Sequence, residues 1–199
     1  MIKKILLVLT VLFSPLMSVT GMAKNGPLSL KSITGGEFYA HGIYGVNPLA
    51  DGESYSQLVD GKRIVVSSFK TGEQTGVLFD ADNTKGKVKV SRIDGYIMSP
   101  NQKNILLRTQ TQSIYRHSTT AVYYIYNVQN RTLAPLSDGG PQECPLWSPD
   151  GNMVGFVREG NLFLVKLLFD NAEVQITKDG KFNSIINGKA DWVYEEEFV

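Results

Sequence analysis

The chain has 199 residues, of which 42% are hydrophobic and 20% charged, enough for one domain of ordinary size with a hydrophobic core. With 20 Lys and Arg against 19 Asp and Glu, the net charge is +1, so electrostatics give no reason to expect binding to nucleic acid or to an anionic membrane. The single cysteine, Cys144, excludes an intrachain disulfide and a cysteine-based zinc site. Two histidines, His41 and His117, leave little for a metal cluster, and we expect neither a metal nor a cofactor.

Residues 1–23 have the pattern of a cleaved signal peptide. Lys3 and Lys4 precede an almost purely apolar run, and small residues occupy the −3 and −1 positions of a cleavage site after Ala23. The apolar run is shorter than the roughly 20 residues of a membrane span, and an uncleaved N-terminal anchor is the alternative. Cleavage removes two lysines and no acid, which leaves a net charge of −1. We expect an exported protein of a bacterial periplasm or cell surface, where a chain with one cysteine fits.

After the leader, the chain is predicted to be all-β. No stretch keeps a helical apolar period over three turns, whereas short runs rich in β-branched and aromatic residues alternate with turns of Asp, Asn and Gly. The strongest of these runs are residues 63–69, 105–109, 121–128, 153–157 and 162–168.

A repeat organises these strands. Ser99-Pro100 and Ser148-Pro149 each follow two apolar residues, lie 49 positions apart, and each precede a similar series of short strands. Four short strands in roughly 40–50 residues are typical of a β-propeller blade. The prediction is a partial β-propeller over residues 51–199, preceded by an N-terminal segment over residues 24–50; a small β-sandwich is the alternative.

About three blades are expected, over residues 54–80, 92–137 and 144–178. Three blades do not close a propeller, because closure takes at least four. An open array exposes strand edges, which favour aggregation. We therefore expect the chain to be incomplete as a folding unit. Cys144, at the start of a strand near Trp147, is expected to be a small buried hydrophobic residue.

Three consecutive carboxylates, Glu195, Glu196 and Glu197, stand beside Trp192 and Tyr194 near the C-terminus, in a segment placed at residues 188–199. A run of glutamates is usually a solvated surface, but flanking aromatic residues would anchor it against a core. Adjacent carboxylates that converge repel each other unless a cation lies between them. Neighbouring side chains of a strand point to opposite faces, so convergence predicts a helical or turned backbone here.

The string over residues 191–197, Asp-Trp-Val-Tyr-Glu-Glu-Glu, resembles the double-glutamate motif of the dipeptidyl peptidase IV family. Residues 115–118, Tyr-Arg-His-Ser, resemble the Arg-His-Ser segment of the same family, and the likeness runs from about Leu28 to Val199. The resemblance implies a serine exopeptidase that releases N-terminal dipeptides with proline or alanine in the second position. It also implies an eight-bladed propeller joined to an α/β-hydrolase domain.

The resemblance also implies the roles of three residues. Glu196 and Glu197 would bind the free amino group of the peptide, and Arg116 would contact a substrate carbonyl and steady the glutamates. Glu195 is not expected to bind substrate, and His117 is expected to be a loop residue and not the catalytic histidine.

No catalytic residue is expected in this chain. The family's nucleophile lies in a Gly-x-Ser-x-Gly elbow, and no such string occurs among the 199 residues; the nearest, residues 52–56, lacks the second glycine. We expect the front part of a longer peptidase, acting on peptides with a free N-terminus, whose residues 24–50 pack near a missing hydrolase domain. A homodimer is expected for the full-length protein. The alternative function is a non-catalytic, propeller-derived periplasmic binding module.

Overall fold

The computed structural model describes residues 28–39 and 44–197. The chain divides into two units, Met1–Gly42 and Ile43–Val199, and the expected signal peptide lies outside the described residues. In the first unit, α1 (Leu30–Thr34) begins at a capping box in which Ser29 and Ser32 bond to each other's backbone, and none of its residues is buried. No helix within the described ranges combines the length and apolar character that a membrane crossing requires.

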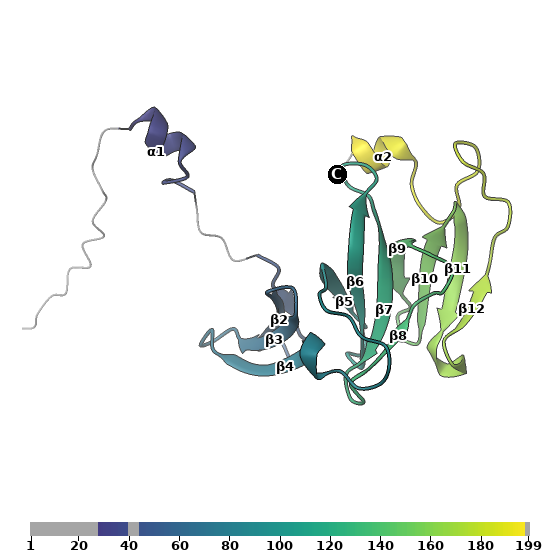
Figure 1. Cartoon of the computed structure of the whole chain (residues 1–199), viewed down its shortest axis with the longest axis horizontal. Coiled ribbons are helices and arrows are strands. Elements are labelled where there is room, and N and C mark those ends of the chain that lie inside the picture. Colours follow the sequence, from purple (N-terminus) through teal and green to yellow (C-terminus); the bar gives the residue numbers. More distant parts are fainter. Residues whose placement is uncertain (1–27, 40–43, 198–199) are drawn as a thin grey trace, which may run out of the picture. The chain divides into compact units, whose positions relative to one another are not determined.

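The second unit begins with a four-stranded antiparallel sheet (Figure 1). Its strands, in spatial order, are β1 (Asn47–Pro48), β2 (Ser54–Val59), β3 (Arg63–Ser68) and β4 (Gln74–Asp80). The sequence did not predict β1, which precedes the first expected blade. A two-residue strand that contains proline is tolerated here because β1 is an edge strand, where a missing N–H breaks no ladder. A short 3-10 helix, η1 (Ala81–Asn83), follows β4.

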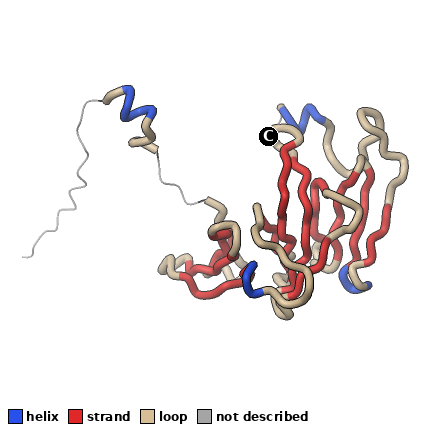
Figure 2. Tube along the Cα trace, in the orientation of Figure 1, coloured by secondary structure: helices blue, strands red, loops and turns tan. Residues whose placement is uncertain are grey.

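The remaining strands form two four-stranded antiparallel groups (Figure 2). The first group is β5 (Gly95–Met98), β6 (Asn104–Ser113), β7 (Thr119–Asn127) and β8 (Thr132–Pro135). The second group is β9 (Gln142–Trp147), β10 (Met153–Arg158), β11 (Asn161–Lys166) and β12 (Ala172–Gln175), with the 3-10 helix η2 (Leu167–Phe169) before β12. Pairing of Thr120 with Glu143 and of Ala121 with Gln142 joins β7 to β9 and merges the groups into one eight-stranded sheet.

The predicted fold class is confirmed: the described residues are nearly all-β and form three four-stranded antiparallel blades. Over the described residues the sheets do not close into a ring.

Two hydrophobic cores lie on opposite faces of the middle blade. In β6, Leu106 faces one core while its neighbours Ile105 and Leu107 face the other, and all three side chains are fully buried. This alternation follows from the two-residue period of a strand. The apolar run over residues 105–107 is therefore continuous because both faces of its blade are covered.

The first core joins the middle blade to the third blade, and the second core joins it to the first blade. The members of the first core are Leu106, Ala121, Tyr123, Ile125, Leu136, Trp147, Val154, Phe156, Phe163 and Val165. The members of the second core are Ile64, Phe79, Ala81, Val90, Ile93, Ile105, Leu107, Tyr126 and Leu133.

Cys144 is exposed, so the expectation that it is buried is wrong. The pairing of β9 with β10 shifts register between Gly155 and Val157, and Cys144 has a left-handed backbone with φ 48°. Such a bulge turns its residue out of the regular alternation of the strand. Trp147, after the bulge, is buried, and its indole N–H donates to the carbonyl of Ile97 at 3.2 Å.

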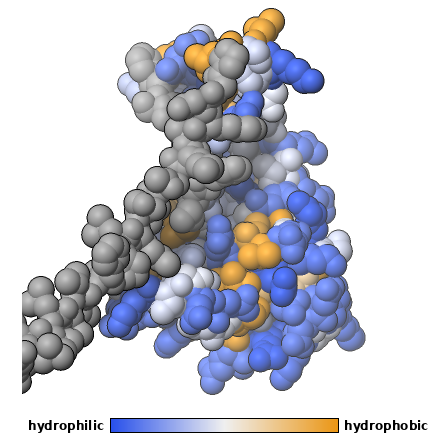
Figure 3. Space-filling view, turned by 90° about the vertical axis from the view of Figure 1, so that its left-hand side faces the viewer, coloured by the Kyte–Doolittle hydropathy of each residue, from blue (hydrophilic) through white to orange (hydrophobic). Residues whose placement is uncertain are grey.

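Hydrophilic side chains cover most of the coloured surface in Figure 3, with hydrophobic side chains between them. Large apolar side chains that are exposed include Phe69, Leu146, Leu168 and Phe182. Apolar atoms make up much of the accessible surface of any folded protein.

Candidate functional site

The triple-glutamate run lies on a short helix, α2 (Trp192–Glu196). The Asp191 carboxylate begins the helix by accepting hydrogen bonds from the backbone N–H groups of Val193 and Tyr194, at 3.1 and 3.3 Å. Glu197 is the C-cap residue, and its N–H donates to the carbonyl of Val193 at 2.8 Å. The prediction of a helical or turned backbone at the glutamates is therefore confirmed.

Arg116 and Glu196, which are 80 positions apart, meet at this helix. The backbone N–H of Arg116 donates to Oε2 of Glu196 at 2.7 Å, and the guanidinium Nη2 lies 3.3 Å from Oε1. The Arg116 side chain is 60% exposed and that of Glu196 is 30% exposed. The β6–β7 loop thus holds both oxygens of one carboxylate while leaving the pair open to solvent.

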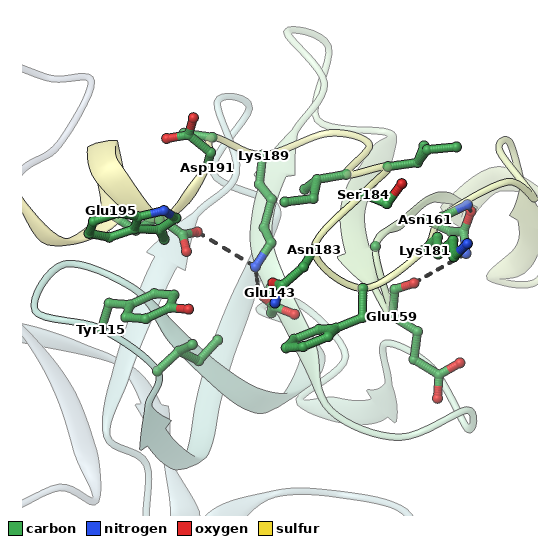
Figure 4. A pocket seen from close by; sticks show the side chains of 18 residues that line it. Tyr115, Glu143, Glu159, Asn161, Lys181, Asn183, Ser184, Lys189, Asp191 and Glu195 are labelled. Atoms are coloured by element: carbon green, nitrogen blue, oxygen red, sulfur yellow. Dashed lines mark hydrogen bonds and ion pairs between the residues drawn. The ribbon is translucent and has the colours of Figure 1, made fainter.

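Glu195 points the other way and is buried, with 9% of its side chain exposed. Lys189 Nζ lies 3.6 Å from Oε1 of Glu195 and 2.5 Å from Oε2 of Glu143 on β9. Figure 4 shows Lys189 between the two carboxylates. The backbone N–H of His117 also donates to the carbonyl of Glu195 at 2.9 Å. His117 therefore holds α2 through its backbone, as a loop residue would.

The charge state of Lys189 follows from these contacts. Burial acts to lower the pKa of Lys189, but the hydrogen bond to Glu143 and the charges of Glu143 and Glu195 outweigh it, so the pKa lies above its ordinary value. Lys189 is therefore an ammonium at neutral pH. Lys189 thus places one positive charge between the buried carboxylate of Glu195 and the partly buried carboxylate of Glu143, so the group of three carries a net charge of −1.

Glu197 is exposed. The contacts within residues 44–197 join Arg116 to Glu196, but none of them joins either residue to the Glu197 side chain. The structure therefore brings together two of the three predicted site residues and leaves the third beside them at the end of α2.

A cavity of about 950 Å³ lies beside this helix (Figure 4). Its lining includes Tyr115 and Glu195, the direct sequence neighbours of Arg116 and Glu196, together with Glu143 and Lys189. Residues 180–186 also line the cavity. The cavity thus combines both signs of charge with aromatic and aliphatic walls, as binding sites for small molecules and peptide ends commonly do.

The sequence reasoning missed Glu143 and Lys189. Each stands alone among residues of other types, and they are 46 positions apart. The only local signal is that Lys189 lies between a glycine turn and the Asp191 helix cap. That signal does not reveal a partner on another blade.

Fold and site together define a bladed all-β protein of the β-propeller type that carries a carboxylate-rich helix at one end of its sheets. The chain matches the family described as "Dipeptidyl peptidase IV (DPP IV) N-terminal region" over residues 99–199, which is half of its length. The chain belongs to this family.

Named relatives agree with this assignment. "Probable dipeptidyl-aminopeptidase B" of Talaromyces stipitatus is 34% identical over 90% of this chain and 22% of its own length. The protein of the same name from Aspergillus fumigatus is 42% identical over 51% of this chain and 11% of its own length. The crystal structure of Porphyromonas gingivalis dipeptidyl peptidase 4 superposes with a TM-score of 0.77 and 41% identity, covering 87% of this chain and 25% of that one. The chain thus spans about a tenth to a quarter of the length of these relatives.

Proposed function

We propose that this chain is the N-terminal propeller portion of a serine exopeptidase that releases X-Pro or X-Ala dipeptides from peptide N-termini. Its own task is to gate access and to bind the free amino group of the peptide through Glu196 and Glu197, with Arg116 beside them. The observation that carries this proposal is the contact between Arg116 and Glu196 on an exposed edge of α2.

The chemistry of a peptide N-terminus fits this site. An α-amino group has a pKa near 8 and is mostly an ammonium at neutral pH. Glu196 and Glu197 supply two carboxylates, and charge-assisted hydrogen bonds from an ammonium to carboxylates are short and strong. Such a clamp would fix the position of the N-terminus, so that cleavage occurs at a set distance from it. An acetylated peptide would lose both the charge and the donors.

Arg116 supports the clamp in two ways. Its backbone N–H and guanidinium hold both oxygens of Glu196, which leaves the carboxylate little freedom to turn away. The guanidinium is a planar fork of donors and is 60% exposed. It can therefore also donate to a carbonyl of the bound peptide.

The remaining parts of the proposal concern the whole protein. Bond cleavage is assigned to an α/β-hydrolase domain, and residues 24–50 are proposed to pack near that domain. We propose that the chain is exported to the periplasm or cell surface, with its signal peptide removed after Ala23, and that the full-length protein forms a homodimer.

The experiment is a calorimetric titration of the chain with alanyl-proline amide and with its N-acetylated form. We expect the free amine to bind at least about tenfold more tightly. Glu196→Gln should weaken binding of the free amine by about 2 kcal/mol, roughly 30-fold, because a charged partner is lost. Glu197→Gln should act in the same direction. Glu73→Gln is the matched control, since Glu73 is exposed in the turn between β3 and β4 of the first blade, and it should leave binding unchanged.

Equal binding of the free and acetylated peptides would contradict the proposal. That result, together with Glu196→Gln binding like the parent chain, would favour a propeller-derived binding module that reads some other feature of its ligand.

A further inference from the structure

Three charged side chains, that of Glu195 buried and those of Glu143 and Lys189 partly buried, connect α2 to the sheet. Lys189 Nζ lies 2.5 Å from the carboxylate of Glu143 and 3.6 Å from that of Glu195, and the three side chains are 14%, 16% and 9% exposed. Glu143 belongs to β9, where its neighbour Gln142 is fully buried and accepts a hydrogen bond from the Tyr123 backbone at 3.0 Å. Glu143 therefore stands on a fixed part of the fold.

We propose that Lys189 is a positioning residue for the amine-binding site: it joins Glu143 to Glu195 and thereby sets the rotation of α2. This inference rests on the proposed function, because its purpose is to present Glu196 to the peptide. It concerns residues other than the three that are proposed to bind the peptide.

The helix needs such a connection because it is short. An isolated helix of five residues has no stability of its own in water, so its contacts decide its orientation. Successive helical residues point about 100° apart. When Lys189 holds Glu195 toward β9, the next residue, Glu196, is turned toward the β6–β7 loop, where Arg116 meets it.

Lys189 also offsets the repulsion between the carboxylates of Glu195 and Glu143. Glu195 and Glu143 would repel each other in a buried setting if no cation lay between them. Without Lys189, the relief of this repulsion favours moving Glu195, and with it α2, away from the sheet. Glu196 would then leave its place beside Arg116.

The test compares Lys189→Met, Lys189→Arg and the control Lys70→Met in the full chain. Lys70 is exposed in the turn between β3 and β4 of the first blade and does not line the cavity. Two properties are measured: the NMR shift of the Trp192 indole N–H, which reports on α2, and the affinity for alanyl-proline amide. The chain has two tryptophans, and the buried Trp147 serves as the internal reference for the fold.

We expect Lys189→Met to shift the Trp192 signal, leave the Trp147 signal in place and weaken peptide binding about tenfold. Lys189→Arg should restore most of both properties, and Lys70→Met should change neither. The proposal is overturned if Lys189→Met keeps the parent Trp192 signal and the parent affinity. It is also overturned if Trp147 and Trp192 change together in every folded variant, because Lys189 then supports the fold in general.

If Lys189→Met does not fold, the double variant Lys189→Met, Glu143→Gln removes the repulsion and keeps the test decisive. The Lys189 contact that holds Glu195 toward β9 is still absent in that variant, so a Trp192 signal at its parent position overturns the proposal. The two proposals also fail separately. A parent chain that binds no free-amine peptide refutes the amine-binding function, and the Trp192 signal alone then decides whether Lys189 sets the position of α2.

Discussion

The side-chain amide of Asn101 donates a hydrogen bond to the backbone carbonyl of Asp150 at 2.8 Å. The two residues occupy equivalent places in the two Ser-Pro turns, 49 positions apart. Within each turn the serine hydroxyl bonds to the side chain two residues later, at 2.9 Å for Asn101 and 2.5 Å for Asp150. The repeat seen in the sequence is therefore also a contact between blades.

Asp150 gives a prediction about acid stability. Hydrogen bonds from the Ser148 hydroxyl and from Asn152 hold the pKa of Asp150 below its ordinary 3.8. A lowered pKa in the folded state means that the carboxylate adds stability above about pH 4, and that this contribution is lost as the pH falls through the folded-state value. Asp150→Asn keeps the acceptor oxygen but not the charge. The parent chain should exceed this variant in urea-unfolding free energy at pH 6, with the gap closing toward pH 3.

Ser148→Ala is the matched control for this prediction. It removes the hydroxyl that donates to Asp150, so it should reduce the pH dependence of the unfolding free energy between pH 6 and pH 3. A gap between parent and Asp150→Asn that stays constant down to pH 3 would contradict the assignment.

Gly188 is predicted to be required just before α2. Its φ is +78°, and a Cβ added there would lie 2.9 Å from Cγ2 of Val157, which is in the core. Gly188→Ala should lower the free energy of unfolding by about 1–2 kcal/mol for the left-handed backbone and by about 1–3 kcal/mol more for overpacking. Gly72→Ala is the control, with φ +71° and open space around its Cβ. In urea denaturation, Gly72→Ala should lose only the unfolding free energy that the left-handed backbone costs. Equal losses for Gly72→Ala and Gly188→Ala would contradict the close packing of Gly188 against Val157.

Arg158 is predicted to hold the last strand of the third blade. Its guanidinium lies 4.1 Å from the centre of the Phe163 ring and 2.7 Å from Glu173 on β12. Because the Arg158 side chain is only 15% exposed, Arg158→Met should cost about 1–3 kcal/mol of unfolding free energy. Arg158→Lys should fall between, since it keeps the charge and loses the planar contact.

The exposed pair of Lys62 and Asp82, 3.5 Å apart, supplies the comparison. Lys62→Met should change stability by less than about 1 kcal/mol. If Arg158→Met and Lys62→Met lose similar amounts of unfolding free energy in chemical denaturation, the burial of Arg158 does not strengthen its contacts and the prediction is wrong.

Arg116 is predicted to matter less for peptide binding than Glu196. Arg116→Met removes the guanidinium contact at 3.3 Å but keeps the backbone hydrogen bond to Glu196 at 2.7 Å. Affinity for alanyl-proline amide should fall about threefold to tenfold, because exposed ion pairs and single hydrogen bonds each contribute modestly. Arg63→Met, which breaks a surface pair with Asp60 at 3.8 Å, should leave the affinity unchanged. A loss as large as that of Glu196→Gln would assign Arg116 the leading role.

Much of the fold could be predicted from local patterns. The runs at residues 63–69 and 121–128 correspond to β3 and β7, because a strand's preference for β-branched and aromatic residues acts over a few neighbouring positions. The two Ser-Pro turns predict the blade repeat because turn preferences are also local. The predicted burial of Cys144 is wrong because a bulge depends on how β9 pairs with β10, and the residues of β9 alone do not reveal it.

The sequence by itself determined that the chain is a β-rich array of blades. Its resemblance to a family motif also predicted that the glutamates near residue 196 lie close to Arg116. Only the tertiary structure decided the separate places of the three glutamates. Glu195 is buried and pairs with Lys189, which also pairs with Glu143; Glu196 pairs with Arg116; and Glu197 is exposed at the end of α2. The physical reason is that strand and turn preferences act between neighbours in the chain. Which charges are buried together depends on how separate blades and a five-residue helix pack in space.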